Sequence, residues 1–276
     1  MTSYSPTTLA RGIREAVIEQ SYRAHVGHIG SSLSIADLLA ALYTRAPAET
    51  AGDPSERDRV VLSKGHAALA LYAALELTGA LPAGSIDEYC VEDTQLGVHP
   101  EHVVNGVDFS TGSLGHGLSL ACGAALAARM QASTRRAFVV MSDAELNEGS
   151  IWEAAMFAAH HRLANLVAIV DVNGQQALGY TRDVLHLANL SERWAAFGWD
   201  VHTVDGHDPA ALVQLLNSLS TVDGGPHVLL ANTVFGKGVS FMENRLEWHY
   251  LPLSDADYAL ALGELAAARE AAGAET

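Results

Sequence analysis

The stretch that decides the fold is MSDAELNEGS at positions 141–150, together with VDVN at positions 170–173. Asp143 directly follows an expected strand at 137–141, and Asn173 directly follows a β-branched strand of the buried kind at 166–172. The two residues are 30 positions apart, which is the length of one strand–helix–strand crossover. Because parallel strands end at a common ligand-binding edge, we expect both side chains to lie side by side there.

This pair of side chains suits a hard divalent cation. A carboxylate and an amide oxygen favour Mg²⁺ or Ca²⁺ over zinc. Two protein side chains also leave coordination positions for a backbone carbonyl, water and phosphate oxygens. The alternative interpretation makes Asp143 a helix N-cap and Asn173 a turn residue, and the pair alone does not choose between the two.

Helices and strands alternate on both sides of this segment. Ser34 and Asp37 loosely fit a capping box, and Gly79 stands where a helix C′ glycine belongs. The pattern predicts the α/β class, with a doubly wound, mostly parallel sheet flanked by helices in one domain over 1–276. The expected helices are 8–24, 34–43, 67–78, 117–130, 152–162 and 209–220. The expected strands are 137–141, 166–172, 200–204 and 227–233, and residues 60–62 are expected to form a short strand or a turn. A long loop is expected at 46–58 and a fraying helical tail at 266–276.

Composition excludes several classes of protein. With 276 residues, 49% of them hydrophobic, the chain can bury a substantial core. A formal net charge of −16 argues against a nucleic-acid partner. No apolar run approaches about 20 residues, so no membrane span is expected, and residues 1–15 lack the apolar run of a signal peptide. Cys90 and Cys122 make no disulfide framework, which favours a cytoplasmic protein.

Histidine is unusually frequent, with 13 residues against 16 Lys and Arg. Several histidines stand beside glycines in short motifs. These motifs are GHIG at 27–30, LSKGH at 62–66, GVHPE at 97–101, STGSLGHG at 110–117, VDGHD at 204–208, and GKG at 236–238 with WH at 248–249. In this order and spacing, the chain from about residue 9 to 252 resembles the N-terminal, diphosphate-binding half of transketolase.

The resemblance implies the thiamine diphosphate-binding fold of the PP type and a cofactor, thiamine diphosphate with Mg²⁺, for which Ca²⁺ is an alternative cation. Asp143 and Asn173 match the metal ligands, and the carbonyl of Gln175 matches the third protein ligand. The backbone amide of Ala144 matches a donor to the diphosphate.

The glycine-rich loop matches the segment that touches the cofactor rings. Gly112 and Leu114 match the residues at the aminopyrimidine and thiazolium rings, and His116 is interpreted as their neighbour. Glycines allow the backbone to approach a ligand closely. A nicotinamide cofactor is disfavoured because the glycine spacing is not GxGxxG.

Four histidines match family residues near the reactive thiazolium carbon: His28, His66, His99 and, less closely, His249. Imidazole titrates near neutrality and can both donate and accept a proton, as cleavage and formation of a ketose carbon–carbon bond require. The remaining eight are expected to be structural or on the surface: His25, His102, His160, His161, His186, His202, His207 and His227. A zinc site is disfavoured, since only the pairs His25/His28 and His160/His161 approach ligand spacing.

The chain departs from the family pattern at the metal motif and beside the last histidine. Ser142 and Ala144 flank Asp143 where the family usually has glycines, and the Ala144 methyl is compatible only with a negative φ. Gly174 and Gln175 replace bulky apolar residues after Asn173. Tyr250 follows His249 where a small residue is usual, on the border of the family's sugar channel. These changes point to a specialised donor or acceptor.

The resemblance covers only the first part of a full-length transketolase. It therefore implies the diphosphate-binding component of a split enzyme, which transfers a two-carbon ketol unit from a ketose or ketose phosphate to an aldehyde acceptor. A separate C-terminal subunit would supply the glutamate that activates the cofactor, in an α₂β₂ assembly. Two alternatives stay open: a related thiamine enzyme subunit that delivers its fragment to a carrier or another acceptor, and a non-catalytic structural or regulatory paralogue.

Overall fold

The computed structural model describes residues 4–45 and 56–273. Five strands form one sheet in the order β1-β2-β3-β7-β6, and all neighbouring pairs in it are parallel. They are β1 (Arg59–Leu62), β2 (Ala137–Ser142), β3 (Leu166–Val172), β6 (Asp200–Asp205) and β7 (His227–Asn232). A separate antiparallel pair, β4 (Gln175–Gln176) and β5 (Gly179–Tyr180), lies just after β3. The predicted mostly parallel α/β sheet is confirmed.

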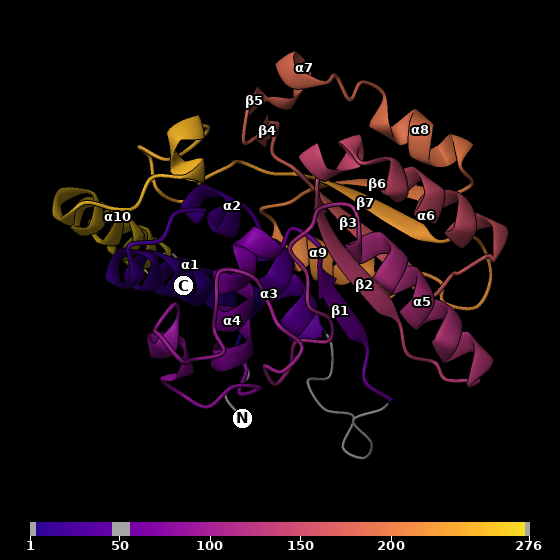
Figure 1. Cartoon of the computed structure of the whole chain (residues 1–276), viewed down its shortest axis with the longest axis horizontal. Coiled ribbons are helices and arrows are strands. Elements are labelled where there is room, and N and C mark those ends of the chain that lie inside the picture. The colour runs from indigo at the N-terminus through magenta and orange to yellow at the C-terminus, as the bar shows by residue number, and fades with distance from the viewer. Residues whose placement is uncertain (1–3, 46–55, 274–276) are drawn as a thin grey trace.

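Helices cover both faces of the sheet, as a doubly wound fold requires (Figure 1). One face carries α1 (Pro6–Ala24), α2 (Ile29–Ser34), α3 (Ala36–Arg45), α4 (Ala68–Leu77) and α9 (Pro209–Ser218). The other carries α5 (Gly117–Met130), α6 (Gly149–His160) and α8 (Leu190–Ala196). The remaining helices are α7 (Thr181–Val184), α10 (Asp255–Gly273), which packs on α1, and the 3₁₀ segments η2 (Gly65–Ala67), η3 (Ser85–Glu88), η4 (Ala144–Asn147) and η5 (Leu246–His249).

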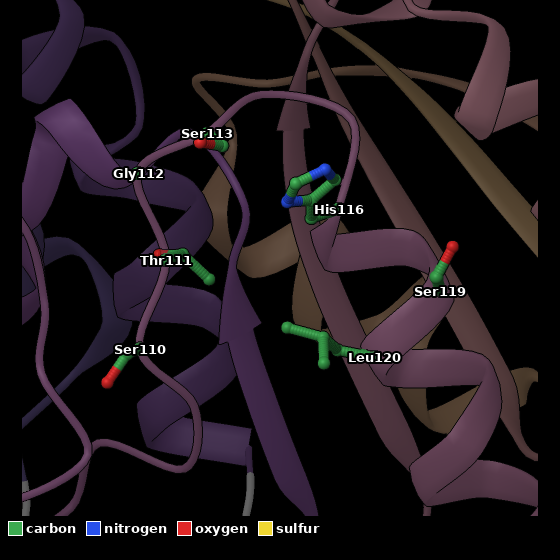
Figure 2. Close-up of a pocket in the computed structure, with 7 residues that line it drawn as sticks. All are labelled: Ser110, Thr111, Gly112, Ser113, His116, Ser119 and Leu120. Carbon is green, nitrogen blue, oxygen red and sulfur yellow. The ribbon is translucent and has the colours of Figure 1, made fainter.

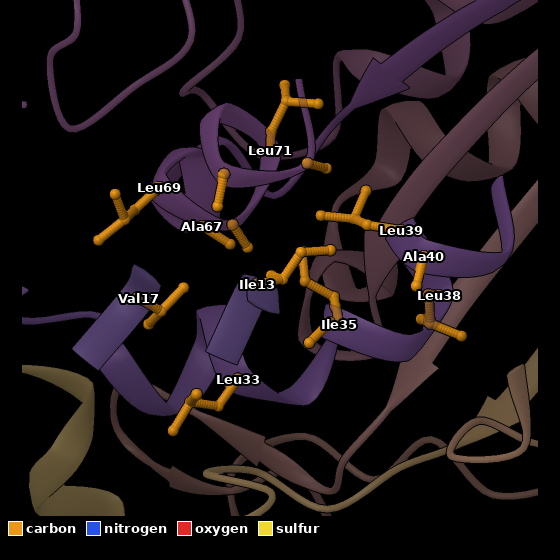
Figure 3. Packing of buried hydrophobic residues seen from close by; sticks show 14 of the residues in the cluster. Ile13, Val17, Leu33, Ile35, Leu38, Leu39, Ala40, Ala67, Leu69 and Leu71 are labelled. Carbon is orange, nitrogen blue, oxygen red and sulfur yellow. The ribbon is translucent and has the colours of Figure 1, made fainter. Parts of the chain in front are cut away.

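The two-residue period of the strands divides the core in two. In β2, Phe138 and Val140 join the cluster beneath α1, α3 and α4, whereas Val139 and Met141 join the cluster beneath α5 and α6. Side chains alternate across a strand, so a continuous apolar run serves both layers. Figure 3 shows the first cluster, where Ile13 of α1 packs among leucines of α2, α3 and α4.

The prediction of a single helix at 34–43 is wrong, both in where the helix begins and in its being continuous. The chain forms two helices there, α2 and α3, which are separated at Ile35. Ser34 ends α2 and does not cap α3, because its hydroxyl donates to the Ser31 carbonyl and to Asp171 Oδ2, the latter at 2.7 Å. Asp37 accepts instead from Arg14 and contacts His207 Nδ1 at 2.8 Å. Tertiary partners therefore outcompete the local capping box.

The structure also bears on the predicted end of α4, the C-terminal tail and the long loop. Gly79 adopts φ +83°, and Ala80 N donates to Leu75 O across the end of α4, which confirms the C′ glycine. Helix α10 starts at Asp255, well before the helical tail expected at 266–276, and residues 274–276 lie outside the described residues. Most of the loop expected at 46–58 also lies outside them. Among the described helices, none is both long and apolar enough to cross a bilayer.

Candidate functional site

Asp143 and Asn173 lie together at the carboxyl edge of β2 and β3. The Gly174 amide donates to Asp143 Oδ2 at 2.8 Å, and the Gln175 amide donates to Asn173 Oδ1 at 2.9 Å. Asp143 is 2% exposed, and this burial, with the nearby Asp171 charge, raises the pKa of Asp143 to about 7. The strand–helix–strand spacing thus placed the two side chains correctly.

Ala144 meets the backbone condition set by its methyl group. It begins η4 directly after Asp143 and does not adopt a positive φ. Its amide donates to Asp143 Oδ1 at 2.8 Å. Alanine at this position therefore causes no backbone strain.

A buried ion pair supports this edge from below, and sequence reasoning missed it. Lys64 Nζ lies 2.6 Å from Asp171 Oδ2, and both residues are 0% exposed. Asp171 also accepts hydrogen bonds from Ser34, Asn173 and Thr233. The available signal was an aspartate inside an otherwise apolar strand, because a charge there needs a buried partner.

A second buried carboxylate, Glu145, ties the glycine-rich loop to the metal motif. Its Oε1 accepts from Gly115 N at 2.7 Å and from the Ser63 hydroxyl, which in turn accepts from Gly117 N at 3.0 Å. Burial raises the pKa of Glu145 although these hydrogen bonds oppose the shift. A Cβ on Gly117 would lie 2.2 Å from Ser63 Oγ, so this helix start has no space for a side chain. Sequence reasoning assigned no role to Glu145.

The glycine-rich loop borders a cavity of about 570 Å³. Figure 2 shows the loop facing His116 and Leu120, which come from the start of α5. Two predicted cofactor-binding residues, Gly112 and His116, line the cavity, whereas Leu114 lies in the same loop and does not. The full lining is Ser110, Thr111, Gly112, Ser113, His116, Ser119 and Leu120. Gly112 is also packed against a catalytic candidate, because a Cβ there would lie 3.2 Å from His99 Cδ2.

Three of the four predicted catalytic histidines form a triangle of rings. The His28 centroid lies 5.2 Å from that of His66 and 5.5 Å from that of His249, and His66 lies 5.6 Å from His249. The backbone amide of His28 donates to the His249 carbonyl at 3.1 Å. A Cβ on Gly27 would lie 2.4 Å from the Tyr250 carbonyl, so glycine is required where the two segments meet. We call His28, His66 and His249 the histidine cluster.

The histidine cluster is electrostatically suited to stay neutral. Burial, followed by the charge of Lys64, lowers the pKa of His66 well below its ordinary value, and burial followed by His28 lowers that of His249 to about 4. The pKa of His28 is lowered by burial and then by His99. His66 Nε2 contacts Ser31 Oγ at 2.8 Å, but the buried Nδ1 atoms of His28 and His249 have no hydrogen-bond partner among the described residues.

Tyr250 borders the histidine cluster and is 60% exposed. Its ring centroid lies 5.0 Å from that of His249 and 6.0 Å from that of His28. A large aromatic side chain therefore stands at the solvent side of the cluster, at the position where sequence analysis noted a departure from the family.

The other histidines do not gather into a metal centre. Within residues 4–45 and 56–273, no three His, Cys, Asp or Glu side chains are grouped so that they could hold a metal ion. His207 bridges Asp37 and the Val234 amide, the latter at 2.8 Å, and His227 Nε2 contacts the Ser220 carbonyl at 2.8 Å. These two rings hold parts of the chain together.

Comparison with known proteins agrees with this geometry. Residues 6–271 match the family model described as transketolase, thiamine diphosphate binding domain. This chain belongs to the transketolase family. It is 42% identical to a 6-deoxy-6-sulfo-D-fructose transketolase subunit of a Clostridium species, over 93% of this chain and 94% of that one. It is 41% identical to a subunit of the apulose-4-phosphate transketolase of Phocaeicola vulgatus, over 86% and 85% of the two chains.

Solved transketolases have the same fold. The Campylobacter jejuni enzyme matches with a TM-score of 0.85 and 27% identity, over 95% of this chain and 42% of that one. A Pichia stipitis transketolase mutant matches with a TM-score of 0.87 and 27% identity, over 95% and 40%. This transketolase-family chain thus has the thiamine diphosphate-binding fold and belongs among the thiamine diphosphate-dependent transferases. It spans less than half the length of these solved enzymes, and nearly the whole length of relatives that are named as subunits.

Proposed function

We propose that this chain is the diphosphate-binding component of a two-component transketolase, which transfers a two-carbon ketol unit from a ketose or ketose phosphate to an aldehyde acceptor. One observation carries the proposal: a continuous polar network joins the histidine cluster to the candidate metal ligands. His66 contacts the Ser31 hydroxyl, the Ser31 carbonyl accepts from Lys64, and Lys64 pairs with Asp171, which accepts from Asn173. Groups suited to sugar chemistry and groups suited to a metal-bound diphosphate therefore share one strand edge.

The residues at this edge fit the magnesium ion of thiamine diphosphate. Asp143, the amide oxygen of Asn173 and the backbone carbonyl of Gln175 would hold Mg²⁺, and Ca²⁺ could take its place. The Gln175 side chain is 4% exposed, and both of its amide atoms are buried without a partner among the described residues, which leaves polar groups beside the site for a ligand. The Ala144 amide, which donates to Asp143 Oδ1 in this structure, would donate to the diphosphate.

The glycine-rich loop would receive the organic part of the cofactor. Gly112 lies between the His99 ring and the backbone of Gly65. A Cβ added to Gly65 would come within 2.9 Å of Gly112 N. This close packing brings the main chain of Gly112 next to His99, and Leu114 and His116 follow in the same loop. We assign these loop residues to cofactor binding.

The histidines of this chain would carry the proton transfers. Bound thiamine diphosphate would supply a centre that stabilises the carbanion formed when a ketose carbon–carbon bond breaks. His28, His66, His99 and His249 would accept the proton of the C3 hydroxyl and return a proton to the acceptor's carbonyl oxygen. Low pKa values keep His28, His66 and His249 neutral, so each ring has one nitrogen that can accept and one that can donate.

The donor substrate is proposed to be a ketose with an anionic group at the end away from the carbonyl. The names of two relatives contain such sugars, 6-deoxy-6-sulfo-D-fructose and apulose-4-phosphate. Tyr250 stands beside the histidine cluster on its exposed side. Its ring would narrow the sugar channel and favour a specialised donor or acceptor.

The proposed assembly is α₂β₂ with a C-terminal, pyrimidine-binding subunit that supplies the activating glutamate. The names of the two relatives as subunits support a separate partner. The unpaired thiols of Cys90 and Cys122 agree with a cytoplasmic location.

Reconstitution tests this proposal. We expect ketol transfer from a ketose to an aldehyde by the mixture of this chain and its partner subunit, and no transfer by either alone. Coupled aldehyde-release assays on the two subunits and on their equimolar mixture measure this. Robust turnover by this chain without a partner would contradict the two-component arrangement. Cofactor binding without turnover in the mixture would favour a non-catalytic paralogue.

A further inference from the structure

We propose that Lys64 and Asp171 form a positioning pair, which fixes the amide of Asn173 so that its oxygen faces the magnesium ion. This inference rests on the proposed function. It adds a role for Lys64 and Asp171, to which the proposed function assigns no contact with the metal or the sugar. They lie one layer behind the site, between the metal ligands and the histidine cluster.

The direction of the hydrogen bonds carries the first step. An amide side chain presents an oxygen on one side and an NH₂ group on the other, and either can face a neighbour. Asp171 Oδ2 lies 2.9 Å from Asn173 Nδ2. An ionised carboxylate only accepts hydrogen bonds, so Asp171 selects the orientation in which the NH₂ group of Asn173 points inward. The amide oxygen must then face away from Asp171, on the side where it accepts from the Gln175 amide.

The second step is the charge of Asp171. This carboxylate lies at 0% exposure inside β3, where an unpaired charge would be very unfavourable. Lys64 Nζ compensates it at 2.6 Å. The hydroxyls of Ser34 and Thr233 donate to its two oxygens as well. The carboxylate is therefore held in one place as a pure acceptor.

The third step explains why a lysine occupies this position. Lys64 Nζ also donates to the Ser31 carbonyl at 3.1 Å, and the Ser31 hydroxyl contacts His66 Nε2. One ammonium group thus holds the segment that orients a cluster histidine and the carboxylate that orients a metal ligand. A buried ion pair that served stability alone would not need contacts on both sides of the site.

The remaining hydrogen bond of Asn173 agrees with this role. Asn173 Oδ1 accepts a single hydrogen bond, from the Gln175 amide at 2.9 Å. A carbonyl oxygen has two lone pairs, so one remains for a cation. If the amide were reversed, an NH₂ group would face the cation and repel it.

The test measures magnesium dependence in the reconstituted two-subunit protein, with thiamine diphosphate as the probe and calorimetry as the readout. Removing a group that orients a metal ligand weakens metal affinity by about 10–100-fold. We therefore expect Asp171→Asn to raise the Mg²⁺ concentration at half-saturation by that factor, since an amide at 171 no longer selects one orientation of Asn173. The double variant Lys64→Met/Asp171→Asn, which contains no unpaired buried charge, should show the same increase.

Asp58→Asn is the matched control. Asp58 is also a largely buried carboxylate, paired with Arg45 at 3.0 Å, but it precedes β1 at the opposite end of the sheet. It should lower the unfolding temperature without changing the Mg²⁺ half-saturation. A merely structural Lys64–Asp171 pair would behave in the same way as this control.

Several outcomes separate the possibilities. A folded Asp171→Asn or double variant with wild-type Mg²⁺ dependence would overturn the inference and leave the proposed function intact. If neither variant folds, Thr233→Val decides the matter, because it removes one donor to Asp171 and keeps the ion pair. That variant should give a smaller increase in half-saturation, and no increase would overturn the inference. Absence of magnesium-dependent binding in the wild type would instead contradict the proposed function and the inference with it.

Discussion

The proposed metal edge, which consists of Asp143, Asn173 and the Asp171 behind them, lies close to the histidine cluster, but the two differ in how their polar atoms are bonded. At the proposed metal edge, the side-chain oxygens of Asp143, Asn173 and Asp171 all accept hydrogen bonds within the chain, whereas the Gln175 side-chain amide beside them has no partner among the described residues. In the histidine cluster, the buried Nδ1 atoms of His28 and His249 have no partner among the described residues. Buried polar atoms usually are bonded, so each exception calls for an explanation.

This difference in bonding agrees with different proposed roles for the metal edge and the histidine cluster. On the proposed function, the internal hydrogen bonds of Asp143, Asn173 and Asp171 would position these oxygens for an ion that demands a defined arrangement of ligands. On the same proposal, the histidine cluster, in which the Nδ1 atoms of His28 and His249 have no partner among the described residues, would exchange protons with a changing substrate. The polar network through Ser31 and Lys64 joins the two regions.

The largest expected effect comes from breaking the metal edge. Asp143→Ala should abolish magnesium-dependent thiamine diphosphate binding, because a direct ligand contributes more than the 10–100-fold typical of the groups behind it. Calorimetry on the reconstituted protein measures this. Asp183→Ala, which removes a carboxylate that is 65% exposed on α7, is the control and should bind normally. Unchanged affinity in Asp143→Ala would refute the metal-ligand assignment.

The next effect should come from the histidine cluster, and it should differ in kind. His66→Ala is expected to lower kcat by about 10²–10⁴-fold, the range for a lost acid–base group, with much less effect on cofactor affinity. Steady-state kinetics beside the binding assay separates the two quantities. His160→Ala, at an exposed position on α6, is the control. Equal losses in binding and turnover would mean that both regions act as one binding site.

The smallest effect concerns stability against pH. The pKa of His249 falls to about 4 on folding, through burial and then His28. Below its ordinary value near 6.5, the unfolded chain binds the proton and the native state does not. Titration of His249 therefore leaves the free energy of unfolding unchanged above pH 6.5 and lowers it as the pH falls toward 4, by about 3 kcal/mol at most.

Denaturant unfolding of wild type and His249→Phe across this pH window checks the prediction. The variant should lose part of the acid-side decrease in the free energy of unfolding. His160→Phe should retain the wild-type slope. An identical slope in wild type and His249→Phe would show that His249 is as easily protonated in the native state as in the unfolded one.

Much of the sheet and of the metal edge could be predicted from the sequence. Four of the five strands of the parallel sheet were expected as strands, and β1 was expected as a strand or a turn. Asp143 and Asn173 lie together because adjacent parallel strands must end at the same edge. The split between α2 and α3 could not be predicted, because it depends on Ser34 bonding Asp171, a residue 137 positions away. The Lys64–Asp171 pair joins residues 107 positions apart, so local sequence patterns could not predict it either.

The sequence by itself determined the layers of this protein and the order of its site residues, since strand period and residue type act locally along the chain. Only the tertiary structure decided which charges are paired and which nitrogens stay unpartnered. That information depends on the low-dielectric interior formed when distant segments pack, where each buried polar atom must find a partner or remain available for a ligand.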